Sequence, residues 1–424
     1  MAPDQVGGFS EPTGARTNRS LRVLHIGKYL PPFAGGMEHF LWDLLQAQQA
    51  AGTEAAALVH HERPGWFSVQ PGPADQPAVY RAPCLGRVLY VPVAPSFLLW
   101  LSGAIRRFRP DLLHLHLPNS SALMALALPS ARRLPWVVHW HADLVASELD
   151  RRLALAYRLY RPLEQQLLRR SRVIIATSPP YLEASAALAP WRARCRVVPL
   201  GLDPARLPEP SAAALATADL AWGQGGQGGP RGPGGPGGLR VLAIGRLTYY
   251  KGHEVLLRAL AKTPDVDLVI VGRGEREARL RGLIAKLGLD ARVNLRTGCS
   301  DEQVAALLRR CDLLCLPSLE RTEAFGLVLL EAMQAAKPVL VSDIPGSGAS
   351  WVVQQARHGW LVAPGDVAGL ADALNRIRQA PEQRLCLGVN AAQALDREFG
   401  IQQVAAAINA LYLEALEIKP TGGE

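Results

Sequence analysis

The chain has 424 residues, of which 49% are hydrophobic and 20% charged, and its formal net charge is +9. This length predicts two or three packed domains, and the small charged fraction excludes a chain that is disordered throughout. Six cysteines do not make a disulfide framework at this length, so we expect reduced thiols in a cytosolic protein.

The first half of the chain carries the whole positive excess. Residues 1–200 contain 22 Lys/Arg against 13 Asp/Glu. Such a half could meet anionic lipid or an anionic substrate, or it could present a solvated basic surface. We expect no nucleic-acid partner, because no basic motif interleaved with aromatic residues is present. Residues 1–20 have no apolar core and predict a disordered leader, not a signal peptide.

Short apolar runs rich in Val, Ile and Leu recur after the leader. They read LRVLHIG, EAAALVHH, DLLHLHLP, WVVHWH, RVIIATS and CRVVPLG. Runs of this kind are typical of parallel strands buried on both faces, and helical patterns such as residues 38–51 separate several of them. Residues 21–204 therefore predict a doubly wound α/β domain. Ligands of such sheets bind beyond the carboxyl ends of the strands.

A glycine pair follows the first of these strands. Gly35 and Gly36 precede the predicted helix 38–51. Glycines at this position let backbone N–H groups approach a phosphate at the positive end of the helix. An ordinary strand-to-helix turn explains the pair equally well.

The stretch 88–105 is almost uncharged and approaches the length of a membrane span. Pro92 and Pro95 interrupt it. We interpret it as a short strand, a turn and an amphipathic helix that begins near Ser96. Such a helix could touch a membrane surface without crossing it.

Histidines come in spaced pairs in two of the predicted strands, at His114/His116 and at His139/His141. Residues two apart in a strand share a face. A four-histidine metal site is conceivable, but no carboxylate spacing supports it. We expect instead that a single histidine at a strand end acts on the substrate, and His141 is the last one before the loop.

A Gly/Pro-rich run, residues 223–238, divides the chain. We interpret residues 205–238 as a linker or an expanded loop. The strand rhythm then resumes, which predicts a second doubly wound domain over residues 239–395. Residues 396–418 predict a C-terminal helix that packs back on the first domain. The new strand-like runs are LRVLAIG, VDLVIVG, VNLRTG, LLCLPS, PVLVSD and GWLVAPG.

Two cations follow the first strand of the second half. Arg246 and Lys251 lie between that strand and a glycine at the next predicted helix start. Arg could bind a diphosphate in bidentate fashion and Lys as a point charge, although two surface cations are the plain alternative. The D-x-D sequence at 265–267 precedes its strand, so we interpret it as a turn and expect no metal site there.

The most informative run is Glu323-Ala-Phe-Gly with Glu331. A helix over 325–336 would place Glu323 at its entrance and Glu331 about two turns in. Carboxylates suit the hydroxyl groups of a sugar or a ribose because each accepts several hydrogen bonds. A capping residue and a surface residue are the alternative.

Together these residues resemble glycosyltransferase family 4, a family of retaining enzymes with the GT-B fold of two Rossmann-like domains that face each other across a cleft. The resemblance runs from Leu21 to about Leu416, apart from the linker. Phrases such as CLPSLERTEAFGLVLLEAM are also similar to bacterial mannosyl- and rhamnosyltransferases of polysaccharide assembly. One departure is Ala336, where the family usually has Gly. The markers are Gly35-Gly36, G-R-L-x-x-x-K-G at 245–252, Glu323-Ala-Phe-Gly with Glu331, and Pro364-Gly365-Asp366.

The resemblance implies a role for each marker. Arg246 and Lys251 would neutralise the donor diphosphate, helped by the N–H groups of Gly35 and Gly36. Glu323 would hold hydroxyls of the donor sugar, and Glu331 would hold the ribose. His141 would contact the sugar near the reacting centre. The remaining donor-binding positions are Gly298 beside the base and the backbone of Phe325, Gly326 and Leu327 around the sugar and phosphate.

The function implied is transfer of a hexose, mannose or similar, from a GDP-sugar or another nucleotide sugar, with retention and without a metal ion or other cofactor. The acceptor would be a saccharide or a polyprenyl-diphosphate-linked saccharide, in the cytoplasm or peripherally on the inner face of the plasma membrane. A catalytically silent GT-B scaffold and a nucleotide-sugar epimerase are the alternatives.

Overall fold

The computed structural model describes residues 20–33, 35–69, 76–88, 91–144, 151–222 and 238–417, with side chains of 88, 91 and 151–156 left aside. The predicted leader lies outside the described residues except for Ser20. The Gly/Pro-rich run lies outside them except for residue 238.

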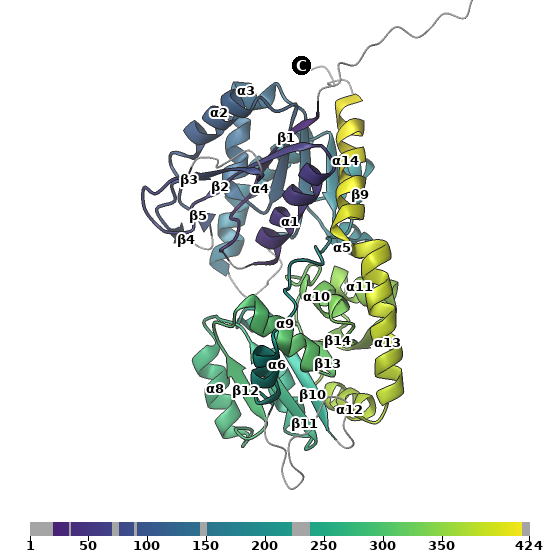
Figure 1. The fold of residues 1–424 in the computed structure, drawn as a ribbon. Coiled ribbons are helices and arrows are strands. Elements are labelled where there is room, and N and C mark those ends of the chain that lie inside the picture. The colour runs from purple at the N-terminus through teal and green to yellow at the C-terminus, as the bar shows by residue number, and fades with distance from the viewer. Residues whose placement is uncertain are drawn as a thin grey trace, which may run out of the picture.

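The first half of the chain forms one parallel sheet of seven strands (Figure 1). All six strands predicted there are confirmed, and the sheet gains an edge strand, β3, that the apolar pattern missed. In sheet order the strands are β3 (Ala78–Ala82), β2 (Glu54–His60), β1 (Arg22–Ile26), β6 (Leu112–Leu117), β7 (Trp136–Trp140), β8 (Val173–Ala176) and β9 (Cys195–Val197).

Helices cover both faces of this sheet. Alternate residues of β1 show the division: Leu24 packs in the cluster that includes Phe97 of α2, whereas Val23 packs in the cluster that includes Phe40 of α1. The C-terminal helix α14 (Ile401–Glu417) lies beside α1 on the second face. The helices of this half are α1 (Gly36–Ala50), α2 (Phe97–Phe108), α3 (Pro129–Arg132), α4 (Arg151–Arg170) and α5 (Pro179–Ala184), with 3-10 turns at Ser120–Leu126 and Ala189–Arg194.

The uncharged stretch 88–105 is not one helix. It contributes to the short antiparallel hairpin of β4 (Arg87–Val88) and β5 (Val91–Pro92), and α2 then begins at Phe97. Among the described residues, no helix has the length and apolar character that crossing a bilayer requires.

The second half forms a parallel sheet of six strands, and all six were predicted. In order they are β12 (Val293–Arg296), β11 (Val266–Val271), β10 (Leu239–Ile244), β13 (Leu313–Leu316), β14 (Val339–Ser342) and β15 (Gly359–Val362). Its helices are α6 (Ala212–Asp219), α7 (His253–Leu260), α8 (Glu277–Lys286), α9 (Asp301–Arg310), α10 (Val328–Gln334), α11 (Gly348–Ala356), α12 (Val367–Arg378) and α13 (Pro381–Ala394).

Helix α10 is shorter than the predicted helix 325–336. Gly326 has a φ of +78°, a left-handed conformation that makes residues 325–327 a turn before the helix. At the other end, Ala336 is also left-handed, with a φ of 54°. The N–H of Lys337 donates to Ala332 O and that of Ala336 to Met333 O, which is the Schellman pattern of a helix end.

The chain passes between the two lobes twice, and the crossings lie together. The first crossing follows β9, and the second runs from α13 through a π-helical turn, Leu395–Phe399, into α14 (Ile401–Glu417) (Figure 1). Leu202 and Gly400 form a parallel bridge between the two crossings. One apolar cluster includes Phe40 of the first lobe and Leu330 of the second, so the lobes share a core along this side.

Candidate active site

Loops from both sheets meet between the lobes. The loops after β1 and β7 come from the first sheet, and those after β10 and β13 from the second. One point of approach is Gly36, where a Cβ atom would lie 3.5 Å from Cβ of Leu327. The glycine-pair loop therefore faces the loop that carries Glu323, as expected for ligand sites beyond strand ends.

Gly35 lies against the side chain of Glu38, which a larger residue at position 35 would displace. Gly35 is extended, with a φ of 174°, but a Cβ there would lie 2.1 Å from Oε2 of Glu38. Glu38 is buried in the first turn of α1, and burial raises the pKa of its carboxyl. A carboxylate therefore lies close to the helix start at which the sequence predicts the diphosphate.

Glu38 has a cationic neighbour, Lys28, in the loop after β1. Burial lowers the pKa of Lys28, and the positive charge of Arg246 lowers it further, while Glu38 acts in the opposite direction. Lys28 thus belongs to the first lobe yet senses a cation of the second. The two lobes bring their positive charges toward one place.

On the second lobe, Lys251 and Glu323 form a close ion pair. Nζ of Lys251 lies 2.5 Å from Oε2 of Glu323, and both side chains are largely buried. Burial disfavours the charged form of Lys251, but Glu323 and the neighbouring Tyr250 outweigh this effect and raise its pKa. Ser318 donates a second hydrogen bond to the same oxygen at 2.9 Å.

Arg246 is exposed beside this pair, and its Nη2 donates to the hydroxyl of Tyr250 at 2.8 Å. The structure thus brings together three of the predicted residues, Arg246, Lys251 and Glu323, and adds Lys28. Three cations opposite two carboxylates, Glu38 and Glu323, leave a positive excess suited to a diphosphate.

Glu331 pairs with an arginine of the first crossing. Its Oε1 lies 3.5 Å from Nη2 of Arg206, a residue of the first crossing, and burial raises the pKa of the carboxyl. Arg206 also pairs with Asp43 of α1 at 3.5 Å. The guanidinium therefore ties α1 to α10 beside the expected ribose position.

His141 follows β7 and is buried, edge-on to the ring of Phe40. Its Nε2 lies 2.9 Å from Nδ1 of His116, while its Nδ1 has no hydrogen-bond partner among the described residues. Burial lowers the pKa of His141 to about 3, so the imidazole is neutral at physiological pH. It can exchange a hydrogen bond with a substrate but cannot supply a positive charge.

An ion pair holds the loop of His141 against the loop of Glu323. Asp143 pairs with Arg321, whose guanidinium also stacks 4.7 Å above the ring of Tyr181. The other carboxylate oxygen of Asp143 accepts from Ser185 at 2.7 Å. His141 and Glu323 each lie two residues from this contact, so the contact places both loops at the same junction.

The remaining predicted positions differ in character. Gly298 is left-handed, with a φ of +75°, and a Cβ there would lie 2.5 Å from Nη2 of Arg273. The ring of Phe325 is buried and edge-on to Phe399, so only its backbone is available to a ligand. Leu327 is buried against the first lobe.

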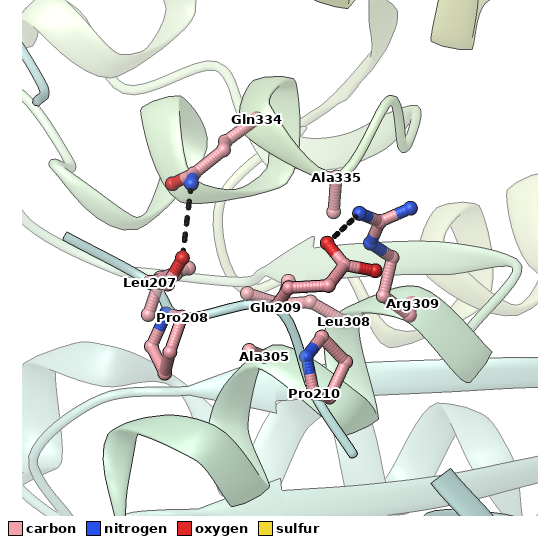
Figure 2. Close-up of a pocket in the computed structure, with 9 residues that line it drawn as sticks. All are labelled: Leu207, Pro208, Glu209, Pro210, Ala305, Leu308, Arg309, Gln334 and Ala335. Carbon is pink, nitrogen blue, oxygen red and sulfur yellow. Dashed lines mark hydrogen bonds and ion pairs between the residues drawn. The ribbon is translucent and has the colours of Figure 1, made fainter. Parts of the chain in front are cut away.

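A shallow pocket opens elsewhere, where the first crossing meets α9 and α10 (Figure 2). Glu209 and Arg309 form an ion pair of 2.5 Å across it, and Gln334 donates to Leu207 O at 3.4 Å. None of the predicted donor-binding residues lines this pocket. It is a seam between packed elements beside the crossing.

Sequence reasoning assigned no role to several residues at this junction. Lys28 could have been found from its place directly after β1. Arg206 pairs with Glu331, and Asp143 with Arg321, only where the two lobes meet, and no spacing in the sequence predicts those contacts.

Two facing parallel α/β sheets with ligand loops at their carboxyl ends define the GT-B class of glycosyltransferases. Residues 35–201 match the family model described as a glycosyl transferase 4-like domain, and residues 236–394 match the one described as glycosyl transferases group 1. The chain therefore belongs to glycosyltransferase family 4 and is a glycosyltransferase.

Two curated relatives cover nearly the whole chain. It is 30% identical over 378 residues to the D-rhamnosyltransferase WbpZ of Pseudomonas aeruginosa. The matched segment covers 88% of this chain and 90% of the relative. It is 28% identical over 409 residues to the O-antigen chain mannosyltransferase C of Escherichia coli, with 94% and 100% covered.

Solved structures agree on the fold. A sucrose-phosphate synthase from Thermosynechococcus elongatus superposes with a TM-score of 0.73 at 24% identity, over 93% of this chain and 98% of that one. HepE of Anabaena, solved in complex with UDP-glucose, superposes with a TM-score of 0.68 at 23% identity, over 93% and 100%.

Proposed function

We propose that the protein is a retaining, metal-independent hexosyltransferase of cell-surface polysaccharide synthesis. It uses a nucleotide sugar, with GDP-mannose or a related GDP-sugar as the first choice, and a saccharide or polyprenyl-diphosphate-linked saccharide as acceptor. The observation that carries the proposal is the convergence of Arg246, Lys251 and Lys28 between the lobes. The names of the two relatives support a mannosyl or deoxyhexosyl donor.

The cations would act on the leaving group. As the bond between the sugar and the diphosphate breaks, negative charge grows on the diphosphate. Fixed cations at that position stabilise it without reorganisation, which is the usual main source of rate in such transfers. Glu323 already holds the side chain of Lys251 in position through their ion pair. The exposed side chain of Arg246 can move onto the bound diphosphate.

Glu323 would orient the sugar. Both hydrogen-bonding contacts described for its carboxylate, from Lys251 and Ser318, fall on Oε2. Oε1 is thus the atom to accept a hydroxyl of the donor sugar. The donor phosphate would take the proton of the acceptor hydroxyl, so the protein needs no side chain as base, and orientation supplies much of the remaining acceleration.

The direct test is transfer itself. The protein is incubated with GDP-mannose, UDP-glucose or dTDP-rhamnose and a panel of saccharide and polyprenyl-diphosphate-linked acceptors, with EDTA present. We expect one product, whose anomeric configuration by NMR matches that of the donor. An inverted product, or a requirement for Mg²⁺ or Mn²⁺, would contradict the proposed mechanism.

A lipid-linked acceptor would bring the first lobe to a membrane. Trp66 is 70% exposed, Phe67 56% and Leu99 74%. Trp66 and Phe67 adjoin the bridge of Gly65 to Cys84, close to the hairpin that precedes α2. Exposed aromatic and aliphatic side chains on a basic half fit contact with an anionic membrane surface.

Vesicle sedimentation tests this contact. We expect binding to anionic vesicles at low salt and loss of binding in Trp66→Ser/Phe67→Ser. Leu385→Ser changes a side chain of α13 that is equally exposed, at 74%, and should bind like the unaltered protein. Equal sedimentation with and without anionic vesicles would remove the membrane from the proposal.

A further inference from the structure

Five of the buried histidines of the first lobe form one cluster, which is far more than one sugar contact needs. They are His25 of β1, His114 and His116 of β6, His139 of β7 and His141 just beyond it. Burial lowers the pKa of each well below its ordinary value, so all five are neutral. A neutral imidazole has one N–H and one bare nitrogen, so any hydrogen bond between two of them has a direction.

Three of the five form a continuous chain that begins on α1. Oε1 of Gln48 lies 2.9 Å from Nε2 of His25, and Nδ1 of His25 lies 3.0 Å from Nε2 of His116. Nδ1 of His116 then lies 2.9 Å from Nε2 of His141. The chain thus joins a buried amide to the histidine at the junction of the lobes.

Helix α14 fixes the orientation of the amide. Nε2 of Gln48 donates to Asn409 Oδ1 at 3.1 Å and to the hydroxyl of Tyr412 at 2.9 Å. In the structure, Nδ2 of Asn409 donates to the hydroxyl of Thr53 at 3.2 Å and its Oδ1 faces Gln48. Gln48 therefore turns its carbonyl oxygen, which can only accept, toward His25.

The donor of each hydrogen bond in the chain follows from the one before it, because a neutral imidazole carries only one N–H. His25 must carry its proton on Nε2 to donate to Gln48, so its Nδ1 is bare and accepts from Nε2–H of His116. Nδ1 of His116 is then bare and accepts from Nε2–H of His141. The Nδ1 of His141 is left bare, and no residue in the part of the chain that the structure describes hydrogen-bonds to it.

We propose that Gln48, His25 and His116 are positioning residues that hold His141 as its Nε2–H tautomer, so that its Nδ1 accepts a hydrogen bond from a sugar hydroxyl. The tautomer follows from the orientation of the Gln48 amide together with the hydrogen bonds of the chain. Only the hydroxyl contact rests on the proposed function. A histidine held this way discriminates against a sugar that lacks a hydroxyl at the matching position, because the bare nitrogen would stay unpaired.

A metal ion is the rival explanation of the cluster. Ring nitrogens of His25, His114 and His116 lie within 4.8 Å of one another, as do those of His116, His139 and His141. Both groups consist only of neutral imidazoles, so an ion would bring an uncompensated charge into the core. Each group also contains one of the nitrogen pairs at hydrogen-bond distance, which the chain already explains.

The test is the protonation of each ring nitrogen, read from two-bond ¹⁵N–¹H correlations of the full-length protein labelled on histidine, with no ligand added. We expect Nε2–H tautomers for His25, His116 and His141, assigned from single His→Gln variants. A proton on Nδ1 of any of the three overturns the proposal. So does stoichiometric metal in the purified protein with ring nitrogens shifted by coordination.

Gln48→Met tests the anchor, because it keeps the length of the side chain and removes the acceptor. We expect His25 and His141 to lose their single tautomer and kcat to fall about tenfold, the scale for losing an orienting partner. The thermal shift with nucleotide should persist. Gln165→Met is the control, since Gln165 bonds to Trp191 and Ala187 outside the cluster.

Unchanged tautomers in Gln48→Met would overturn the role of Gln48. If that variant does not fold, the spectrum of the unaltered protein still decides the direction of the chain. If no sugar nucleotide supports transfer at all, the proposed function fails while the tautomer result stands, so the two failures are distinguishable.

Discussion

Lys251 and Glu323 are functional candidates that also join the loop after β10 to the loop after β13. Their ion pair of 2.5 Å is largely buried, with side chains 12% and 8% exposed. Removal of one partner leaves the other charge buried and unpaired. The resulting loss in the free energy of unfolding is far larger than the net contribution of the pair. A loss of activity in a single variant of this pair would therefore mix two effects.

A double-mutant cycle separates them. We expect Lys251→Met to lower the free energy of unfolding by about 3 kcal/mol, and Lys251→Met/Glu323→Gln to lose less than the two single variants summed. Arg309→Met is the control, because its pair with Glu209 is 50% and 76% exposed and should contribute at most about 1 kcal/mol. Urea unfolding measures all four, and an equal loss in Lys251→Met and Arg309→Met would refute the buried pair.

Glu164 of α4 should make stability depend on pH. Burial raises its pKa from 4.5 to about 7, although Tyr157 donates to it at 2.8 Å. Between those pH values the folded state holds a proton that the unfolded chain has released, so stability falls as pH rises through this window. Glu164→Gln should therefore stabilise the protein at pH 8, by up to about 3 kcal/mol, and change little at pH 4. A constant difference across the range would contradict the assignment.

At the scale of elements, the strands were predictable and the helix ends were not. Twelve apolar runs became twelve strands because both faces of each sheet are covered, so burial leaves no polar alternation to confuse the pattern. Edge strand β3 was not predicted, because Tyr80 and Arg81 interrupt its run of small apolar residues. The predicted helix 325–336 was longer than α10, because the left-handed turn at Gly326 depends on tertiary contacts and not on local helix propensity.

A substitution at the C-terminal end of α10 should make the protein more stable. Ala336 occupies the left-handed position of a Schellman motif, where a Cβ atom costs about 1 kcal/mol or more and glycine costs nothing. We expect Ala336→Gly to raise the free energy of unfolding by about 1 kcal/mol and to leave nucleotide binding unchanged. Ala335→Gly, one residue earlier, has a φ of −84° and should instead destabilise the helix end. Equal effects of the two changes would show that conformation does not matter there.

For the whole molecule, the motifs of the sequence group the candidate residues of one lobe but do not predict the contacts between the lobes. Arg246, Lys251 and Glu323 follow strand ends of one sheet, and motif spacing suffices to group them. The contacts of Arg206 with Asp43 and Glu331, and of Arg321 with Asp143, join residues more than a hundred positions apart. They depend on how the lobes meet, which the two crossings determine and local pattern does not encode.

The most direct test of the account is a thermal-shift series with GDP, UDP, dTDP and ADP, with and without EDTA. One nucleotide should stabilise the protein, by about 2.7 kcal/mol at about 100 times its Kd. The shift should survive EDTA, disappear in Arg246→Ala and persist in Arg309→Ala. No shift with any of the four, or a shift that EDTA abolishes, would contradict a metal-independent donor site between the lobes.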